Sequence, residues 1–353
     1  MRIEDIETPA LIIDEGILKE NMKRMEALLS GGTLALRPHY KSHKCADLAL
    51  RQIRAGAKGM TCAKLSEAED LADAGVGDIL IANQITDPAK CARAARLAGI
   101  CRLTVCVDSA ENIRLLSREA VHAGTVIHCY IEYDIGMRRC GVSTHEEVLA
   151  LAREIEDAEG LSFDGIQAYA GHISHEADTE SRRAFVEQNG KDLRALLGKL
   201  EKAGTPAREL SGGSTGTSRE KREEGLYTEL QAGSYLFMDA TYRALDVPFE
   251  NSLFILCSVV STSARRAVVD AGVKSCGMDQ GAPAPLGFSV CEIGVNEEHF
   301  VLWEPSVPLS VGDRVRLIPG HCCSTVNLYD KIYLVENGMV TGRLFVTARG
   351  KSK

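Results

Sequence analysis

Residues 126–171 read VIHCYIEYDIGMRRCGVSTHEEVLALAREIEDAEGLSFDGIQAYAG, and this stretch decides the fold. Its two ends, 126–134 and 163–171, are short apolar runs of the kind found in parallel strands that are buried on both faces. The segment between them, 143–158, has a helical pattern that opens with Ser143 three residues before Glu146, as in a capping box. The stretch therefore predicts a strand–helix–strand unit.

The same alternation runs through most of the chain. The candidate strands are 34–41, 59–64, 78–83, 103–109, 126–134, 163–171, 208–214 and 230–239. About eight strand–helix units in roughly 240 residues predict an α/β fold of the (β/α)8 TIM-like barrel type. A doubly wound open sheet is the alternative, and the lack of a GxGxxG motif after the first strand counts against it.

The pattern changes near Asn251. The remaining residues form strand-like runs punctuated by Gly, Pro and Asn, with few helical patterns. We therefore predict two domains, a barrel over residues 1–249 and a smaller C-terminal all-β domain over residues 250–353. The first few residues are candidates for an additional strand of the β domain.

Composition excludes several classes of protein. Of 353 residues, 45% are hydrophobic and 25% charged, which is typical of a globular protein, and the net charge of -8 argues against nucleic-acid binding. The start, MRIEDIETPA, has no apolar signal core, and the longest apolar runs are too short to span a membrane, so we expect a cytoplasmic protein. The 12 cysteines form no CxxC pair, which favours free thiols over disulfides.

Lys41 stands near the end of the first candidate strand, within ALRPHYKSHKC (35–45). Catalytic groups of a barrel lie at the carboxyl ends of its strands, and a lysine there can form an imine with an aldehyde cofactor. Such a lysine needs a lowered pKa, which nearby cations favour. The candidate cations are Arg37, His39, His43 and Lys44. The alternative interpretation is a solvated basic loop.

Two further strand ends carry reactive side chains. Arg138 and Arg139 follow 126–134, and one of them could face a cofactor, although Arg138 is better explained as surface charge. Around 163–171, Tyr169 could contact an aromatic ring, unless it is simply a core tyrosine. We expect the same end of the barrel, its mouth, where the carboxyl ends of the strands meet, to carry Gln167, His172 and His175.

Two glycine-rich loops follow the last two candidate strands. SGGSTGTS (211–218) and QAGSYLF (231–237) offer backbone amides and hydroxyls that could hold an anion. Barrels often bind phosphate with the loops after strands seven and eight.

A last motif lies in the predicted β domain. His321 and Cys323 would point to the same side of an extended strand, where imidazole and thiolate could bind zinc, although His-x-Cys alone is often a chance pattern.

With these motifs in this order, the sequence resembles a family, the D-serine dehydratase, D-threonine aldolase and 3-hydroxy-D-aspartate lyase group. These are alanine-racemase-like, fold-type-III pyridoxal-phosphate (PLP) enzymes. The resemblance extends from ETPALIIDE (7–15) to GHCCSTVNLYD (320–330) and rests on RPHxKxHK, QAYxG, SGGST and His-x-Cys.

The resemblance implies a role for each motif. It implies that Lys41 is the Schiff-base lysine, that Arg139 and Tyr169 contact the cofactor, and that His321 and Cys323 bind a divalent metal. Zinc is favoured because thiolate is a soft ligand, with manganese or magnesium as alternatives. It also implies a homodimer, and phosphate contacts from Gly213, Ser214, Gly233, Ser234 and Tyr235.

The resemblance also implies the reaction. We expect a metal-assisted β-elimination on a D-3-hydroxy amino acid, giving a 2-oxo acid and ammonia, with Lys41 as the base. Dehydratases of the group usually have His-x-Cys and aldolases His-x-Asp, which favours elimination here. Retro-aldol cleavage is the alternative, and His172 or His175 could then be the base.

The sequence departs from the patterns of related enzymes at two places, and one further alternative function remains. Racemases have a catalytic tyrosine in their β domain, and the corresponding segment here, 268–279, has none, which argues against racemisation. Ser324 occupies a position where proline is common. A non-catalytic PLP carrier is a further alternative, but such carriers typically lack the β domain.

Overall fold

A computed structural model describes all 353 residues and divides them into two compact units. The barrel unit comprises residues 26–41, 48–233 and 351–353, and the β unit comprises residues 1–25, 42–47 and 234–350. These ranges differ from the predicted boundaries, because the first strand of the chain pairs with C-terminal strands and the second unit begins before residue 250.

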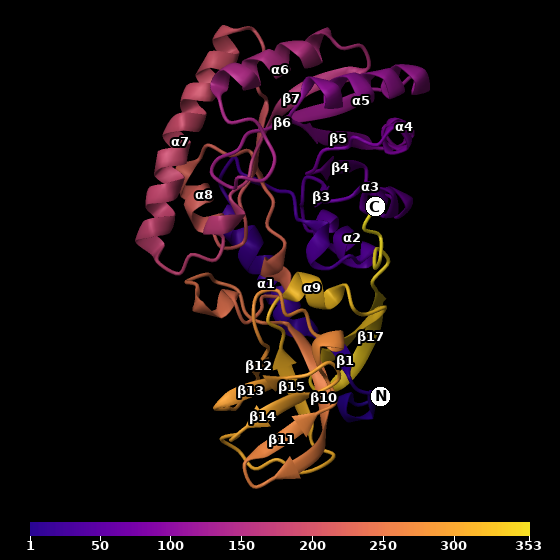
Figure 1. Ribbon diagram of the computed structural model, residues 1–353, viewed down its shortest axis with the longest axis vertical. Helices are drawn as coiled ribbons and strands as arrows, with labels where there is room; N and C mark the ends of the chain where they lie inside the picture. The colour runs from indigo at the N-terminus through magenta and orange to yellow at the C-terminus, as the bar shows by residue number, and fades with distance from the viewer. The chain divides into compact units, whose positions relative to one another are not determined.

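The barrel unit contains eight parallel strands (Figure 1). Around the sheet they follow the order β2-β9-β8-β7-β6-β5-β4-β3, and a parallel bridge between His39 and Thr61 joins the segment after β2 to β3, which closes the barrel. The prediction of a (β/α)8 barrel is confirmed. The strands are β2 (Ala35–Leu36), β3 (Met60–Cys62), β4 (Asp78–Ile81), β5 (Arg102–Val107), β6 (Ile127–Glu132), β7 (Leu161–Ala168), β8 (Glu209–Gly212) and β9 (Glu229–Leu230).

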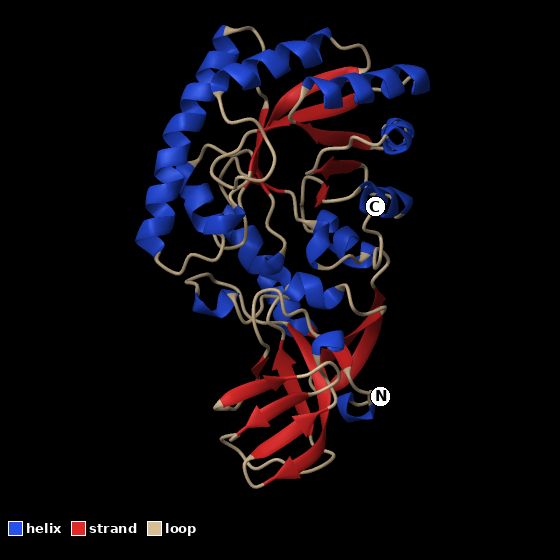
Figure 2. Ribbon diagram, viewed as in Figure 1, coloured by secondary structure: helices blue, strands red, loops and turns tan.

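Helices lie outside these strands (Figure 2). Their starts follow local side-chain chemistry: α6 is capped by Thr144, whose hydroxyl accepts from the amide of Glu147, whereas the capping box was predicted one residue earlier at Ser143 and Glu146. None of the helices combines the length and apolar character needed to cross a bilayer. The helices of the barrel unit are α2 (Ala46–Arg54), α3 (Leu65–Asp73), α4 (Pro88–Leu97), α5 (Ala110–Ala123), α6 (His145–Asp157), α7 (Thr179–Lys202) and α8 (Ser218–Glu224), whereas most of α1 (Glu15–Leu29) belongs to the β unit.

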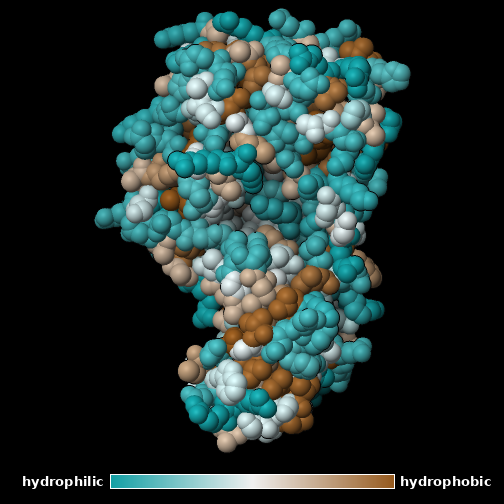
Figure 3. All heavy atoms as spheres, viewed as in Figure 1, coloured by the Kyte–Doolittle hydropathy of each residue, from teal (hydrophilic) through white to brown (hydrophobic).

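The β unit is built around β1 (Ala10–Asp14), which is paired antiparallel with β10 and parallel with β16. Leu11, Ile12 and Ile13 of this strand are buried in the sheet's core. Apolar residues also run along the visible surface of the unit (Figure 3). The other elements are β10 (Leu253–Ser263), β11 (Arg266–Val269), β12 (Ala284–Pro285), β13 (Glu292–Val295), β14 (Phe300–Trp303), β15 (Arg314–Ile318), α9 (Cys322–Val326), β16 (Lys331–Glu336) and β17 (Met339–Phe345).

The first and last barrel strands are much shorter than the sequence predicts. Run 34–41 yields only the two residues of β2, and run 230–239 yields only Leu230, the second residue of β9. Each of these strands is followed by a 3-10 turn, η2 (Tyr40–Ser42) or η4 (Ser234–Leu236). Pro38 cannot donate a ladder hydrogen bond, which limits the first strand. Lys41 therefore lies on a turn beyond the strand.

A buried charge network lies where the barrel strands begin. The guanidinium of Arg37 is 2.8 Å from carboxylate oxygens of both Asp78 and Glu229, and Lys58 is also 2.8 Å from Glu229. Burial alone would lower the pKa of Arg37, but the two carboxylates outweigh it and raise the pKa. Arg37 was predicted to be a cation beside Lys41, and this is wrong, because its charge is used at the first residues of β4 and β9.

Removing this cation should destabilise the barrel strongly. Arg37→Leu removes the cation that Asp78 shares with the fully buried Glu229 and leaves Glu229 only its pairing with Lys58, so we expect the free energy of unfolding to fall by about 3–5 kcal/mol. Urea denaturation measures the change. As a control, Arg114→Ala removes one partner of a solvent-exposed ion pair and should leave the midpoint unchanged. Equal midpoints for the two variants would contradict this assignment.

Candidate active site

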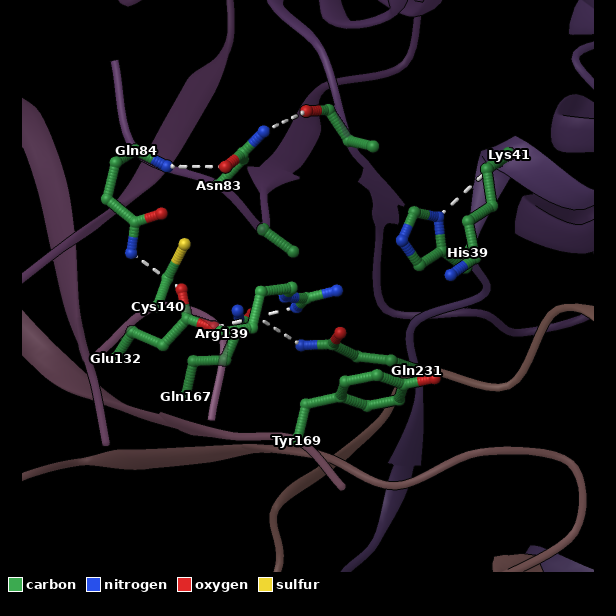
Figure 4. Close-up of a pocket in the computed structure, with 12 residues that line it drawn as sticks. His39, Lys41, Asn83, Gln84, Glu132, Arg139, Cys140, Gln167, Tyr169 and Gln231 are labelled. Carbon is green, nitrogen blue, oxygen red and sulfur yellow. Dashed lines mark hydrogen bonds and ion pairs between the residues drawn. The ribbon is translucent and has the colours of Figure 1, made fainter. Parts of the chain in front are cut away.

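Lys41 lies beside a cavity of about 170 Å³ in the barrel unit (Figure 4). Most of the lining side chains stand at or just after the carboxyl ends of barrel strands, where barrel enzymes place their active sites. The lining residues are His39, Lys41, Ala63, Ala82, Asn83, Gln84, Glu132, Arg139, Cys140, Gln167, Tyr169 and Gln231.

Two cations converge on one aromatic ring in this cavity. The Nζ atom of Lys41 and the Cζ atom of Arg139 each lie 5.8 Å from the centre of the Tyr169 ring. Lys41, Arg139 and Tyr169 were predicted from three separate stretches of sequence, and the structure brings them together. The cavity therefore offers an amine, a guanidinium and an aromatic face within one small space.

The loop after β6 returns Arg139 to the cavity. Asp134 accepts hydrogen bonds from the amides of Gly136 and Arg138, which turns the chain back. Gly141 then passes so close to β6 that an added Cβ would lie 2.8 Å from the carbonyl oxygen of Glu132, at a backbone φ of 102°. Arg138 is exposed, in agreement with its interpretation as surface charge.

A polar network lies beside Arg139, and of its members only Gln167 was predicted from the sequence. Glu132 lies 3.7 Å from Arg139 and accepts a 2.6 Å hydrogen bond from Gln84. Burial raises the pKa of Glu132, although Gln84 and Arg139 oppose the shift. Gln231 donates to Gln167 over 3.0 Å. These residues lie within three residues of the carboxyl ends of β4, β6, β7 and β9, so examining every strand end would have found the other members besides Gln167.

The two histidines predicted near this mouth are outside the lining of the cavity. His172 is exposed and packs edge-on against Phe185 of α7, with ring centres 5.0 Å apart. Neither His172 nor His175 lines the cavity. The 3-10 turn η3 (Gly171–Ile173) begins two residues after Tyr169 and turns the chain, so the side chains after it do not continue along the strand direction.

The predicted phosphate loops follow two adjacent strands of the barrel, β8 and β9. Gly213 has a φ of 71°, and the amide of the buried Ser214 donates to the hydroxyl of Thr217, which fixes a tight turn. Gly233 ends the barrel unit. Ser234 and Tyr235 are buried and belong to the β unit.

His321 and Cys323 lie in the β unit, but not on a strand. His321 is the residue before the short helix α9, and Cys323 is the second residue of that helix, so the extended-strand prediction is wrong. The two side chains are nevertheless close enough to interact, since Cys323 raises the pKa of His321. On an extended strand Cys322 would point the opposite way from Cys323, yet its sulfur is 3.9 Å from that of Cys323, because a helical turn does not alternate sides.

Negative groups surround the His321 ring. Its Nδ1 atom lies 2.7 Å from Asp279, whose other carboxylate oxygen accepts a hydrogen bond from Ser324. Burial of the ring lowers its pKa, but Cys323 and Asp279 outweigh this and raise the pKa of His321 to about 9. The same negative field would favour a metal cation. No cluster of three His, Cys, Asp or Glu side chains is arranged around a metal position, so His321 and Cys323 stand as a pair.

Comparison with known proteins shows which protein family has this two-unit architecture. Residues 13–241 match the alanine racemase N-terminal domain, and residues 252–335 match the putative serine dehydratase domain. The chain belongs to the alanine-racemase-like family.

Relatives over nearly the whole chain narrow this class to D-amino-acid lyases. The chain is 39% identical to a D-threonine aldolase from Arthrobacter sp. (99% of this chain, 94% of the relative). It is 30% identical to D-threo-3-hydroxyaspartate dehydratase from Delftia sp. (91% and 92%). The prediction of a lyase of this group is confirmed, and both its dehydratases and its aldolases are among the relatives.

Solved structures agree with these relatives. D-threonine aldolase from Filomicrobium marinum matches with a TM-score of 0.96 at 35% identity, covering 99% of this chain and 98% of that one. A metal-free cysteine-to-alanine variant of the Delftia dehydratase matches with a TM-score of 0.88 at 28% identity, covering 98% of both chains.

The cysteine pair gives a direct test of metal binding. We expect Cys323→Ala to weaken Zn²⁺ binding by more than about 100-fold, because loss of a group that merely supports a ligand already costs about 10–100-fold. Cys322→Ala, a neighbouring change of the same chemistry at a buried position, should retain affinity. Titration of the full-length chain against a chromogenic chelator measures both. Equal loss in the two variants would contradict the assignment to Cys323.

Proposed function

We propose that this protein is a PLP- and metal-dependent lyase that eliminates water from a D-3-hydroxy amino acid, giving a 2-oxo acid and ammonia. The observation that carries the proposal is the cavity in which Lys41, Arg139 and Tyr169 converge. The family supplies its chemical context, since relatives with either lyase name align over nearly the full chain.

The side chains around the cavity are of the kinds that would bind PLP. Lys41 would hold the cofactor aldehyde, Tyr169 would contact the ring, and Arg139, held near Glu132, would face its polar edge. The glycine-rich loops at Gly213 and Ser214 and at Gly233 to Tyr235 would bind the phosphate, since they follow the seventh and eighth strands of the barrel. When bound, PLP stabilises negative charge at the substrate Cα.

The chain's own acid–base chemistry would come from Lys41. Its amine lines the cavity and would remove the α-proton as general base. Glu132 and Gln84 would keep Arg139 in place through the short hydrogen bond and the ion pair they form.

His321 and Cys323 would hold the metal. An imidazole and a thiolate favour Zn²⁺, with Mn²⁺ or Mg²⁺ as alternatives. The Delftia dehydratase supports this pair, since its histidine and cysteine variants lie two positions apart, as His321 and Cys323 do, and the cysteine variant is metal-free. A divalent metal supplies a Lewis acid for the β-hydroxyl.

Elimination is favoured over cleavage by the base that the cavity offers. Loss of the α-proton leads to elimination, whereas loss of the β-hydroxyl proton leads to retro-aldol cleavage. Lys41 lines the cavity, and the proposed cleavage bases His172 and His175 do not. Cys323 also favours elimination, because the resemblance associates His-x-Cys with the dehydratases of the group and His-x-Asp with the aldolases.

Retro-aldol cleavage is the second candidate, to glycine or glyoxylate-level products and an aldehyde. The observation in its favour is sequence identity. This chain is 39% identical to the aldolase from Arthrobacter and 30% identical to the Delftia dehydratase. The two candidates share fold, cofactor and metal. The homodimer and the cytoplasmic location stay predictions, supported by the family resemblance and by the sequence.

D-threonine separates the two reactions. We expect 2-oxobutanoate and ammonia in equal amounts as the main products, because Lys41 removes the α-proton. Glycine with an equal amount of acetaldehyde would show cleavage instead and would leave fold and cofactor site unaffected.

Two controls accompany the assay, which quantifies ketoacid, ammonia, glycine and aldehyde from one reaction. L-threonine should be inert. 3-Hydroxy-D-aspartate should follow the same route as D-threonine if it is accepted.

A further inference from the structure

Asp279 connects the proposed metal ligand to the rest of the β unit. Its Oδ2 atom lies 2.7 Å from Nδ1 of His321, and its Oδ1 atom accepts the hydroxyl proton of Ser324. Both carboxylate oxygens are therefore used, one on the ligand and one on the helix that carries Cys323. The pKa of Asp279 is lowered: burial opposes ionisation, but Ser324 and His321 outweigh it.

The segment carrying Asp279 is fixed against this helix. The amide of Gly277 donates to the hydroxyl of Thr325, which itself donates to the carbonyl of His321. A Cβ on Gly277 would lie 1.9 Å from the Ser324 hydroxyl, so only glycine allows this approach. Asp279 is two residues further on, and its position relative to His321 is set by these backbone contacts.

We propose that Asp279 is a positioning residue for the metal, acting through His321, and that Ser324 orients Asp279. An imidazole that donates its Nδ1 proton to a carboxylate keeps a lone pair on Nε2, the nitrogen then left for a metal. The carboxylate also makes the imidazole a stronger ligand. This inference rests on the proposed metal site at His321 and Cys323.

The inference gives Ser324 a function. Its hydroxyl holds the second carboxylate oxygen of Asp279. A proline at that position has no side-chain donor, so this part of the network is specific to a serine-bearing chain.

The test measures Zn²⁺ affinity of the metal-free full-length chain by competition with a chromogenic chelator. Asp279→Asn should weaken binding by about 10–100-fold, because the amide keeps the shape but loses the charge. Ser324→Ala should give a smaller loss in the same direction. Glu298→Gln, which removes an equally negative exposed group that pairs with Lys274, is the matched control and should bind as wild type.

A second readout separates positioning from general damage. Thermal unfolding of the metal-free Asp279→Asn and Ser324→Ala chains should match that of the wild type, because the backbone contacts of Gly277 and Thr325 remain. Wild-type affinity in Asp279→Asn, with binding still lost in His321→Ala, would overturn the inference alone. Undiminished binding in His321→Ala would overturn the proposed metal site and this inference with it.

Discussion

The pairing of Arg37 with Asp78 and Glu229 is the interaction on which the barrel unit depends. Arg37 directly follows the short first strand β2, and its two carboxylate partners belong to β4 and β9, so one guanidinium joins three parts of the barrel. Backbone bonds complete the closure: Arg37 donates to Leu230 of β9, and Thr61 of β3 donates to Pro38. The strand that is fixed in this way leads directly to Lys41, whose place at the cavity follows from that closure.

Much of the architecture could be predicted because strand and helix patterns are local. Runs such as 126–134 carry their signal in a few consecutive apolar residues, and the rule that strand carboxyl ends meet at one edge placed Lys41, Arg139 and Tyr169 in one cavity. The limits came from tertiary contacts. The use of Arg37 in a buried ion network depends on Asp78 and Glu229, which lie 41 and 192 residues away in sequence.

The same limit explains the errors at the other site residues. A two-residue periodicity placed His321 and Cys323 on a strand, yet a short helix begins at Cys322, and the pair meets across its first turn. His172 and His175 were placed near the mouth by continuing a strand that ends at Ala168. The contacts of Asp279 could not be predicted, because they depend on the loop around residue 279 folding against α9.

The central claim is that Lys41 carries the cofactor, and borohydride reduction followed by peptide mapping tests it most directly. Reduction of the purified enzyme with bound PLP should attach the pyridoxyl group to one peptide, and fragmentation should place it on Lys41. The nearby Lys44, which follows in the same RPHYKSHK stretch, provides an internal comparison. A pyridoxyl group on Lys44, or on any lysine other than Lys41, would contradict the account.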